Sequence, residues 1–191
     1  MGATDDLPRF HPETRAEWRA WLAENHATAP GVWFVNWKRG TGRPSFPYGE
    51  AVEEALCVGW IDSLKRTLDE ERSVQLYTPP RRGSGWSRSN KERLVRLEAE
   101  GLMLPAGVAV VDAAKADGSW TLLDDVEALV EPPDLTAALD AVPGARANWD
   151  GFPASAKRLA LYWIVQAKRP ETRAKRVAET ARLAGEGKRA G

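Results

Sequence analysis

The chain has few of the residues that bind metal ions or form disulfides. Its 191 residues include one cysteine, Cys57, and two histidines, His11 and His26. A single cysteine cannot form an internal disulfide, and a structural zinc site needs about four thiolate or imidazole ligands at chelating spacing. We therefore expect neither a disulfide nor a metal site.

Long apolar runs and net charge are also missing. No hydrophobic segment approaches the roughly 20 residues that span a bilayer, and "MGATDDLPRF" has no secretory-signal pattern. The 27 basic and 27 acidic residues give a formal net charge of zero, which disfavours a dedicated nucleic-acid-binding protein. The expectation is a cytoplasmic globular protein without membrane insertion.

Common catalytic motifs are absent too. The sequence contains no G-x-S-x-G, no Walker loop and no G-x-G-x-x-G, so serine hydrolysis, P-loop phosphoryl transfer and classical dinucleotide binding lack their usual support. Cys57 lies within "EEALCVGW" on a predicted core helix, where it is interpreted as a small hydrophobic residue. No cofactor is expected, and an enzymatic function is disfavoured.

Periodic patterns predict an α+β, mainly α-helical fold. The strand at 31–40 and the hairpin at 61–78 predict a small antiparallel sheet of about three strands, packed by helices. Helices are expected at 11–26, 48–60, 89–101, from Pro105, at 153–168 and from Pro170. In the helix at 153–168 the residues predicted to face the core are Ala156, Leu159, Ala160, Trp163, Ile164 and Ala167.

An acidic connection, "DGSWTLLDDVEALVEPPDL", separates two predicted domains. It has a turn signal at "DG" and ends at Pro132 and Pro133. We therefore predict an α+β domain at 1–131 and a helical C-terminal domain at 132–191.

Two stretches of the first predicted domain suggest a ligand site. In "CVGWIDS", Trp60 and Asp62 share one face of an extended segment, although Asp62 can equally be paired with a basic neighbour. In "PPRRGSGWSRSN", arginines and a tryptophan precede a helix start, a combination that attracts phosphate or carboxylate. The alternative is that Trp86 fills a sheet edge while the arginines are solvated.

A basic ridge is predicted near the C-terminus, in "AKRPETRAKR". Arg169, Arg173 and Arg176 follow one another at helical spacing. The alternative is a salt-bridged surface that faces the acidic connection at Asp124, Asp125 and Glu127. Our hypothesis is that both basic segments converge around a tryptophan wall. The predicted ligand-binding residues are Trp60, Asp62, Tyr77, Arg81, Arg82, Trp86, Ser87, Asn90, Lys168, Arg169, Thr172, Arg173 and Arg176.

Three specific hypotheses about function stay open at this point, beside the general one of a protein-interaction module. The favoured one is a non-catalytic binding or protective protein whose basic site takes an anionic or aromatic small molecule. The second is nucleic-acid binding by the C-terminal helix pair joined at "KRP". The third is an enzyme with Asp62 as a general base. No oligomeric state is predicted.

The same stretches carry a family resemblance. "ALCVGWIDS", "PPRRGSGWSRSNKERL" before "EGLMLPAG", and "AKRPETRAKRV" resemble the YdeI/OmpD-associated family, also called bacteriocin-protection proteins. The similarity runs from "WRAWLAENH" to "LAGEGK", with "PPRR" where the family has a "PR" pattern, and residues 134–188 resemble its helical C-terminal domain. The resemblance implies a small, mainly helical bacterial protein associated with bacteriocin protection or with a porin, and it implies no catalytic residue.

Overall fold

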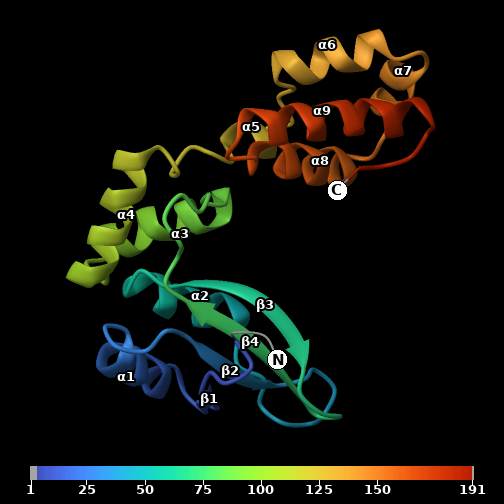
Figure 1. Ribbon diagram of the computed structural model, residues 1–191. Coiled ribbons are helices and arrows are strands. Elements are labelled where there is room, and N and C mark those ends of the chain that lie inside the picture. Colours follow the sequence, from blue (N-terminus) through green and yellow to red (C-terminus); the bar gives the residue numbers. More distant parts are fainter. Residues whose placement is uncertain (1–3, 191) are drawn as a thin grey trace. The chain divides into compact units, whose positions relative to one another are not determined.

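The computed structural model describes residues 4–190, which form nine helices and one four-stranded sheet (Figure 1). The chain divides into two compact units. Unit 1 comprises Met1–Ser84 and Ser89–Gly118, and unit 2 comprises Gly85–Arg88 and Ser119–Gly191. The expected α+β, mainly helical class is confirmed. The boundary predicted after residue 131 stays a prediction.

The sheet of unit 1 has one strand more than expected. Its strands are β1 (Arg9–Phe10), β2 (Val32–Trp37), β3 (Ile61–Thr67) and β4 (Arg72–Thr78), in the order β1-β2-β4-β3. The pairs β2–β4 and β3–β4 are antiparallel as predicted, whereas β1 pairs parallel to β2. A two-residue strand is too short to show an alternating pattern, which is why the sequence did not reveal β1.

Four helices accompany this sheet, namely α1 (Arg15–Asn25), α2 (Tyr48–Cys57), α3 (Arg88–Ala99) and α4 (Pro105–Asp117). Helix α1 begins later than predicted, because Thr14 caps it by accepting a hydrogen bond from the backbone N–H of Glu17 at 3.2 Å. Helix α4 approaches α2 closely at Gly107, where a Cβ would lie 2.4 Å from the carbonyl oxygen of Cys57. The α2–α4 packing therefore requires glycine at this position.

The two faces of the sheet have different cores. On the face covered by α1, Trp18 lies against Phe34 and Tyr77, with ring centroids 5.0 and 5.4 Å apart. The Trp18 indole N–H also donates to the carbonyl oxygen of Ala51 at 3.0 Å, which joins α1 to α2. The other face carries a smaller cluster consisting of Trp33, Val35, Val74 and Leu76, with Leu7 and Leu68 packed against it. Alternation along β2 and β4 explains this division.

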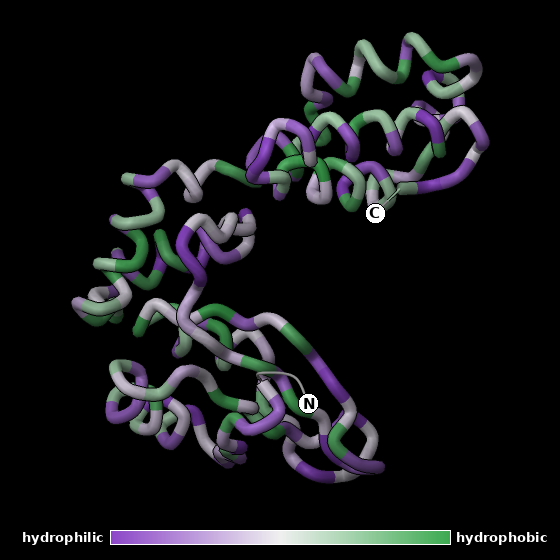
Figure 2. Tube along the Cα trace, in the orientation of Figure 1, coloured by the Kyte–Doolittle hydropathy of each residue, from purple (hydrophilic) through white to green (hydrophobic). Residues whose placement is uncertain are grey.

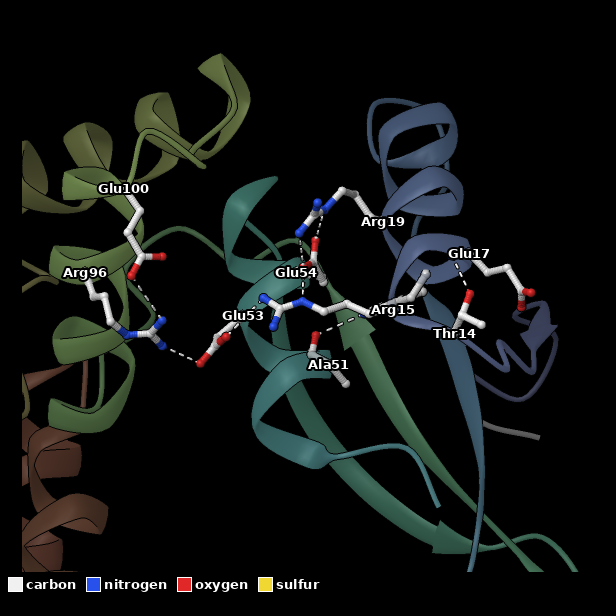
Figure 3. A network of polar contacts seen from close by, with 10 residues as sticks. Thr14, Arg15, Glu17, Arg19, Ala51, Glu53, Glu54, Arg96 and Glu100 are labelled. Atoms are coloured by element: carbon white, nitrogen blue, oxygen red, sulfur yellow. Dashed lines mark hydrogen bonds and ion pairs between the residues drawn. The ribbon is translucent and has the colours of Figure 1, made fainter. Parts of the chain in front are cut away.

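A buried carboxylate lies between α1 and α2 (Figure 3). The side chain of Glu54 is 1% exposed and pairs with Arg15 at 2.5 Å and Arg19 at 2.6 Å. Glu53 on the same helix pairs with Arg15 at 3.1 Å and with Arg96 of α3. Burial opposes ionisation of Glu54, but the hydrogen bonds from Arg19 and Arg15 outweigh it and lower the pKa of its carboxyl group.

Unit 2 contains α5 (Asp124–Glu127), α6 (Pro133–Ala141), α7 (Ala145–Gly151), α8 (Ala154–Val165) and α9 (Pro170–Gly185). Figure 2 shows apolar stretches alternating with polar ones along these helices. Its core includes Leu135, Leu139, Trp149, Ala160, Leu161, Ile164, Val177 and Ala181. The helix start at Pro170 is confirmed.

The apolar stripe predicted for residues 153–168 is partly wrong. Ala156, Ala160 and Ile164 are buried as predicted, but Leu159 is 52% exposed and Leu161 takes its place in the core. The buried stripe of α8 therefore consists of Ala156, Ala160 and Ile164, at positions i, i+4 and i+8, together with Leu161. Leu159 lies at the edge of this stripe, where it lines a groove beside α5.

Candidate functional site

A large cavity lies in unit 1, at the end of the sheet where β2 leads into the loop before α2. Its volume is about 840 Å³. Residues from β2, from the loop and from β3 and β4 contribute to it. The lining residues are Asn36, Trp37, Lys38, Arg39, Ser45, Phe46, Pro47, Tyr48, Lys65, Arg66, Thr67 and Ser73.

Strand register places a row of polar side chains in this cavity. Ser73 of β4 pairs with Asn36 on one side and with Thr67 on the other. Paired residues point to the same face of a sheet, which here is the face that carries Phe34 two residues before Asn36. The polar row therefore lies on the same face of the sheet as the aromatic core and next to it.

The loop over this surface is held by the first residue of that row. The side-chain amide of Asn36 donates to the carbonyl oxygen of Phe46 at 2.8 Å, and the N–H of Phe46 donates to its Oδ1 at 2.8 Å. Between these residues, Gly40 and Gly42 have φ angles of +89° and +74°, a region that favours glycine. The loop is thus fixed at both ends and has a glycine-dependent bend between them.

The charged residues that line the cavity are all cationic. Lys38 donates to the carbonyl oxygen of Asp69 at 2.6 Å, and Arg66 pairs with Asp5 at 3.0 Å. Lys65 and Arg39 are exposed and have no carboxylate partner among the described residues 4–190. Among the described lining residues there is no carboxylate, so the cavity carries an excess of positive charge.

Trp37 and Tyr48, two of the three aromatic residues that line the cavity, lie in different environments. The Trp37 ring has the guanidinium groups of Arg43 and Arg72 at 5.2 and 5.8 Å from its centroid, and the His11 ring at 5.0 Å. Burial first, and Arg72 second, lower the pKa of His11. Tyr48 is 55% exposed.

The hydroxyl group of Tyr48 is fixed by Asp62, to which it donates a hydrogen bond of 2.7 Å. Partial burial, followed by this hydrogen bond, raises the pKa of Tyr48 to about 12. The phenol is therefore neutral at physiological pH, and its ring is held beside the cavity.

The predicted site residues of unit 1 lie in contrasting places. Trp60 and Tyr77 are core residues, 2% and 1% exposed. Asp62 is half-buried and accepts hydrogen bonds from Tyr48 and, at 3.4 Å, from Gln75, so its partners are neutral donors rather than an arginine. Arg81 and Arg82 are exposed in the loop after β4, and Asn90 is half-buried in α3.

Trp86 lies in the interior of unit 2. Its side chain is 3% exposed, and its ring centroid is 5.6 Å from that of Trp120. Gly85 before it packs closely as well, because a Cβ there would lie 2.6 Å from Cγ of Leu123. Ser87 is half-buried next to it. A ligand can reach the Trp86 ring only if neighbouring side chains move.

Two arginines of the basic ridge, Arg173 and Arg176, bind other residues of unit 2. Arg173 makes a bidentate pair with Asp134, at 2.7 and 2.9 Å. Arg176 donates to the carbonyl oxygen of Trp163 and lies 5.2 Å from the centroid of that ring. The carboxylate that pairs with Arg173 is thus Asp134, near the end of the connection and in α6, whereas the alternative interpretation named Asp124, Asp125 and Glu127. Lys168 and Arg169 are exposed before α9, and Thr172 is half-buried in its first turn.

The thirteen predicted residues are divided between the two units. Trp60, Asp62, Tyr77, Arg81, Arg82 and Asn90 belong to unit 1, and Trp86, Ser87, Lys168, Arg169, Thr172, Arg173 and Arg176 belong to unit 2. The convergence of the two basic segments therefore stays a prediction. Within unit 1, the structure joins Asp62 to the candidate cavity through Tyr48.

Sequence reasoning missed the cavity itself. The stretch "NWKRGTGRPSFPY" predicts only the end of a strand, yet it supplies most of the lining. Its signal is a pair of glycines among basic residues between a strand and a helix, a composition that suits contact between a backbone and an anion. Lys65 and Thr67 carry no such signal, because only the hairpin register brings them to this loop.

A second, smaller cavity in unit 2 is an apolar groove of about 300 Å³ between α5 and α8. It is lined by Leu123, Val126, Glu127, Ser155, Arg158, Leu159 and Tyr162. Glu127 is already engaged, because its carboxylate accepts hydrogen bonds from the N–H of Arg88 at 3.0 Å. This groove explains the exposure of Leu159, and its character is opposite to that of the basic cavity.

Within residues 4–190, no group of three or more cysteine, histidine, aspartate or glutamate side chains is placed to hold a metal ion. Nor does any described helix combine the length and apolar character that a membrane span requires.

Comparisons with known proteins divide the chain much as its two units do. Residues 10–110 match the family described as "Domain of unknown function (DUF8412)". Residues 128–187 match the family described as "Bacteriocin-protection, YdeI or OmpD-Associated". The latter match confirms the resemblance for the C-terminal part but not for nearly the whole chain, since a different family model covers the N-terminal part. Neither the curated proteins nor the solved structures contain a match. Because residues 10–110 are more than half of its length, the chain belongs to the DUF8412 domain family, and its C-terminal part carries the YdeI/OmpD-associated domain.

Proposed function

We propose that this protein is a non-catalytic binding protein and that the basic cavity of unit 1 takes a small phosphate-bearing anion. One observation carries the proposal, namely that the cavity is lined by four cationic side chains and, among its described lining residues, by no carboxylate. This site replaces the convergence of the two basic segments as the location of the anion-accepting surface. It keeps the expected character, basic with a tryptophan at its border.

The attraction for an anion comes mainly from two of the four cations. Asp5 partly neutralises Arg66, and backbone carbonyl groups hold Lys38, whereas Lys65 and Arg39 are exposed to the cavity. Two unit charges 4 Å apart attract each other by about 1 kcal/mol in bulk water and by about 4 kcal/mol near a protein surface. Binding should therefore weaken with salt, which screens exposed charges.

The lining chemistry favours binding over a reaction. The described lining residues include no carboxylate, imidazole or thiol that could act as a general base or an activated nucleophile. Tyr48 is not a base at neutral pH, since its pKa is raised to about 12. The hydroxyl, ammonium and guanidinium groups that remain are suited to hydrogen bonding with phosphate oxygens.

Isothermal titration with pyrophosphate tests the proposal on the wild-type chain and on an Arg39→Ala/Lys65→Ala variant. Removing two charged donors should weaken binding at least about tenfold, because hydrogen bonds to charged groups contribute about 1.5–3 kcal/mol each. Lys175→Ala is the matched control, since Lys175 is an exposed lysine of α9 outside the cavity. Equal affinities of the wild type and the double variant would contradict the proposal.

Protection of cells, which the description of the C-terminal family names, enters as part of the same proposal. If ligand binding in unit 1 underlies such protection, cells that carry the double variant lose the resistance given by the wild-type chain. Cells that carry Lys175→Ala keep it. Full resistance with the double variant would separate protection from the cavity.

A further inference from the structure

The cavity is too large for a phosphate group alone. Its volume of about 840 Å³ lies in the upper part of the range of about 300–1,000 Å³ that is typical of small-molecule sites. A phosphate bound by Lys65 and Arg39 would leave most of this space to the rest of the ligand. The side chains along the remaining wall therefore indicate what that part should be.

Tyr48 offers a fixed aromatic surface on this wall. The residue is 55% exposed, although its hydroxyl is held by Asp62 at 2.7 Å, which restricts rotation of the side chain. Among the described residues, no aromatic ring or cation makes a stacking or cation–π contact with it. An exposed aromatic ring that is held in place can stack on a planar ligand at low entropic cost.

Trp37, the largest aromatic side chain at the cavity, already has other side chains packed against its ring. Arg43 and Arg72 lie 5.2 and 5.8 Å from its centroid, and His11 lies 5.0 Å away. These contacts occupy much of the ring, so a ligand would have to displace them. Tyr48 is consequently the aromatic side chain that is better placed to receive a planar group.

Hydroxyl groups lie on the strands that supply the basic residues. Ser73 pairs with Thr67 across β3 and β4, and Lys65 lies two residues before Thr67. Neither hydroxyl has a hydrogen-bond partner within residues 4–190. Such groups can donate to phosphate or sugar oxygens. The cavity thus combines free cations, hydroxyl groups and a fixed ring.

From this arrangement we infer that the ligand of the basic cavity is an aromatic phosphate ester of nucleotide size, with its ring on Tyr48 and its phosphates at Lys65 and Arg39. The inference rests on the proposed function, because it specifies the ligand class of the same site. It also assigns a binding role to Asp62, which positions Tyr48 through the 2.7 Å hydrogen bond and need not contact the ligand.

Titrations with ADP, pyrophosphate and adenosine test the inference on the wild type, Tyr48→Ala and Tyr48→Phe. In the wild type, ADP should bind about tenfold more tightly than pyrophosphate, since stacking of one base on an aromatic side chain is of this order. Tyr48→Ala should remove this advantage, so that ADP and pyrophosphate bind to this variant with similar affinities. Tyr48→Phe keeps the ring but loses the bond to Asp62 that positions it, so its preference for ADP should lie between those of the wild type and Tyr48→Ala. Adenosine, which lacks phosphate, should bind more weakly than ADP.

The outcomes separate this inference from the proposed function. Pyrophosphate binding as tight as ADP binding in the wild type overturns the stacking role while the anion site stands. A Tyr48→Ala variant that loses pyrophosphate and ADP equally also overturns it, provided that its melting temperature matches that of the wild type. If neither pyrophosphate nor ADP binds the wild type, the proposed anion site fails, and the inference fails with it.

Discussion

The two units of the molecule handle charge in different ways. Unit 1 buries the carboxylate of Glu54 beneath two arginines and leaves cations exposed at a cavity, whereas unit 2 pairs arginines with acids on its surface. Arg146, Arg173 and Arg182 of unit 2 each contact at least one carboxylate. A stretch rich in arginine therefore need not be an anion site, because what matters is how many of its charges remain unpaired in the fold.

The largest effect on stability is expected from removing the cations around Glu54. In an Arg15→Ala/Arg19→Ala variant, the buried carboxylate has lost both arginine partners, and unit 1 should be destabilised by about 3–5 kcal/mol. Urea unfolding measures the loss of stability. Hydrogen exchange of the Trp18 indole N–H, which donates to the carbonyl oxygen of Ala51, reports on unit 1 specifically. The indole N–H of Trp149, bonded to Glu131, gives the corresponding measurement for unit 2. A loss below about 1 kcal/mol would show that the Glu54 cluster behaves like a surface pair.

The same variant should reverse the way in which the contribution of Glu54 to the free energy of unfolding depends on pH. In the wild type, the pKa of Glu54 is lowered from its ordinary value of 4.5, so the unfolded chain takes up the proton first as pH falls. The stabilisation is therefore complete above about pH 4.5 and is lost as pH falls through the lower folded pKa. Without the arginines, burial alone raises the pKa, and the contribution of Glu54 should become less favourable as pH rises toward neutrality. Parallel pH profiles for the two proteins would contradict this account.

A smaller effect is expected at Glu131, the corresponding carboxylate of unit 2. It accepts hydrogen bonds from the Trp149 indole at 2.7 Å and from Arg146 at 2.8 Å, and its side chain is 25% exposed. Burial opposes its ionisation, but these donors lower its pKa. Glu131→Gln keeps an acceptor for Trp149 and loses the charge, so the free energy of unfolding should fall by about 1 kcal/mol. A loss as large as that of the Arg15/Arg19 variant would remove the contrast between the units.

The smallest effect is expected at the pair between Asp134 and Arg173. Both side chains are partly exposed, 43% and 34%, and water screens such pairs. Asp134→Asn should therefore cost less than about 1 kcal/mol, and high salt should abolish the difference from the wild type. Thermal unfolding at low and high salt measures this. A larger loss that persists in high salt would mean that the ridge is held by more than a surface ion pair.

Local patterns were sufficient to predict most of the fold. The apolar spacing in α2 and α9 and the alternation in β2 predicted elements that the structure confirms, because each pattern reports which side of its own element is buried. The errors lie where burial depends on distant neighbours. Leu159 fits the stripe of α8 but lines a groove beside α5, and β1 forms only because Arg9 and Phe10 meet β2.

The candidate site was harder to predict for the same reason. Arg173 belongs to a basic stretch, but its partner Asp134 is 39 residues away in the chain. Trp86 lies in a flexible-looking loop, but Trp120 covers it. Conversely, Lys65 of β3 joins the loop after β2 only through the register of the hairpin with β4. The sequence alone therefore indicates which basic and aromatic residues are present, but not which of them lie together in the fold.

A crystal structure of the wild-type chain with ADP tests the central claim most directly. The account predicts density for the phosphates within hydrogen-bonding distance of Lys65 and Arg39, with the base against the ring of Tyr48. Density for ADP at Arg169–Arg176 of unit 2, with the cavity of unit 1 empty, would contradict it.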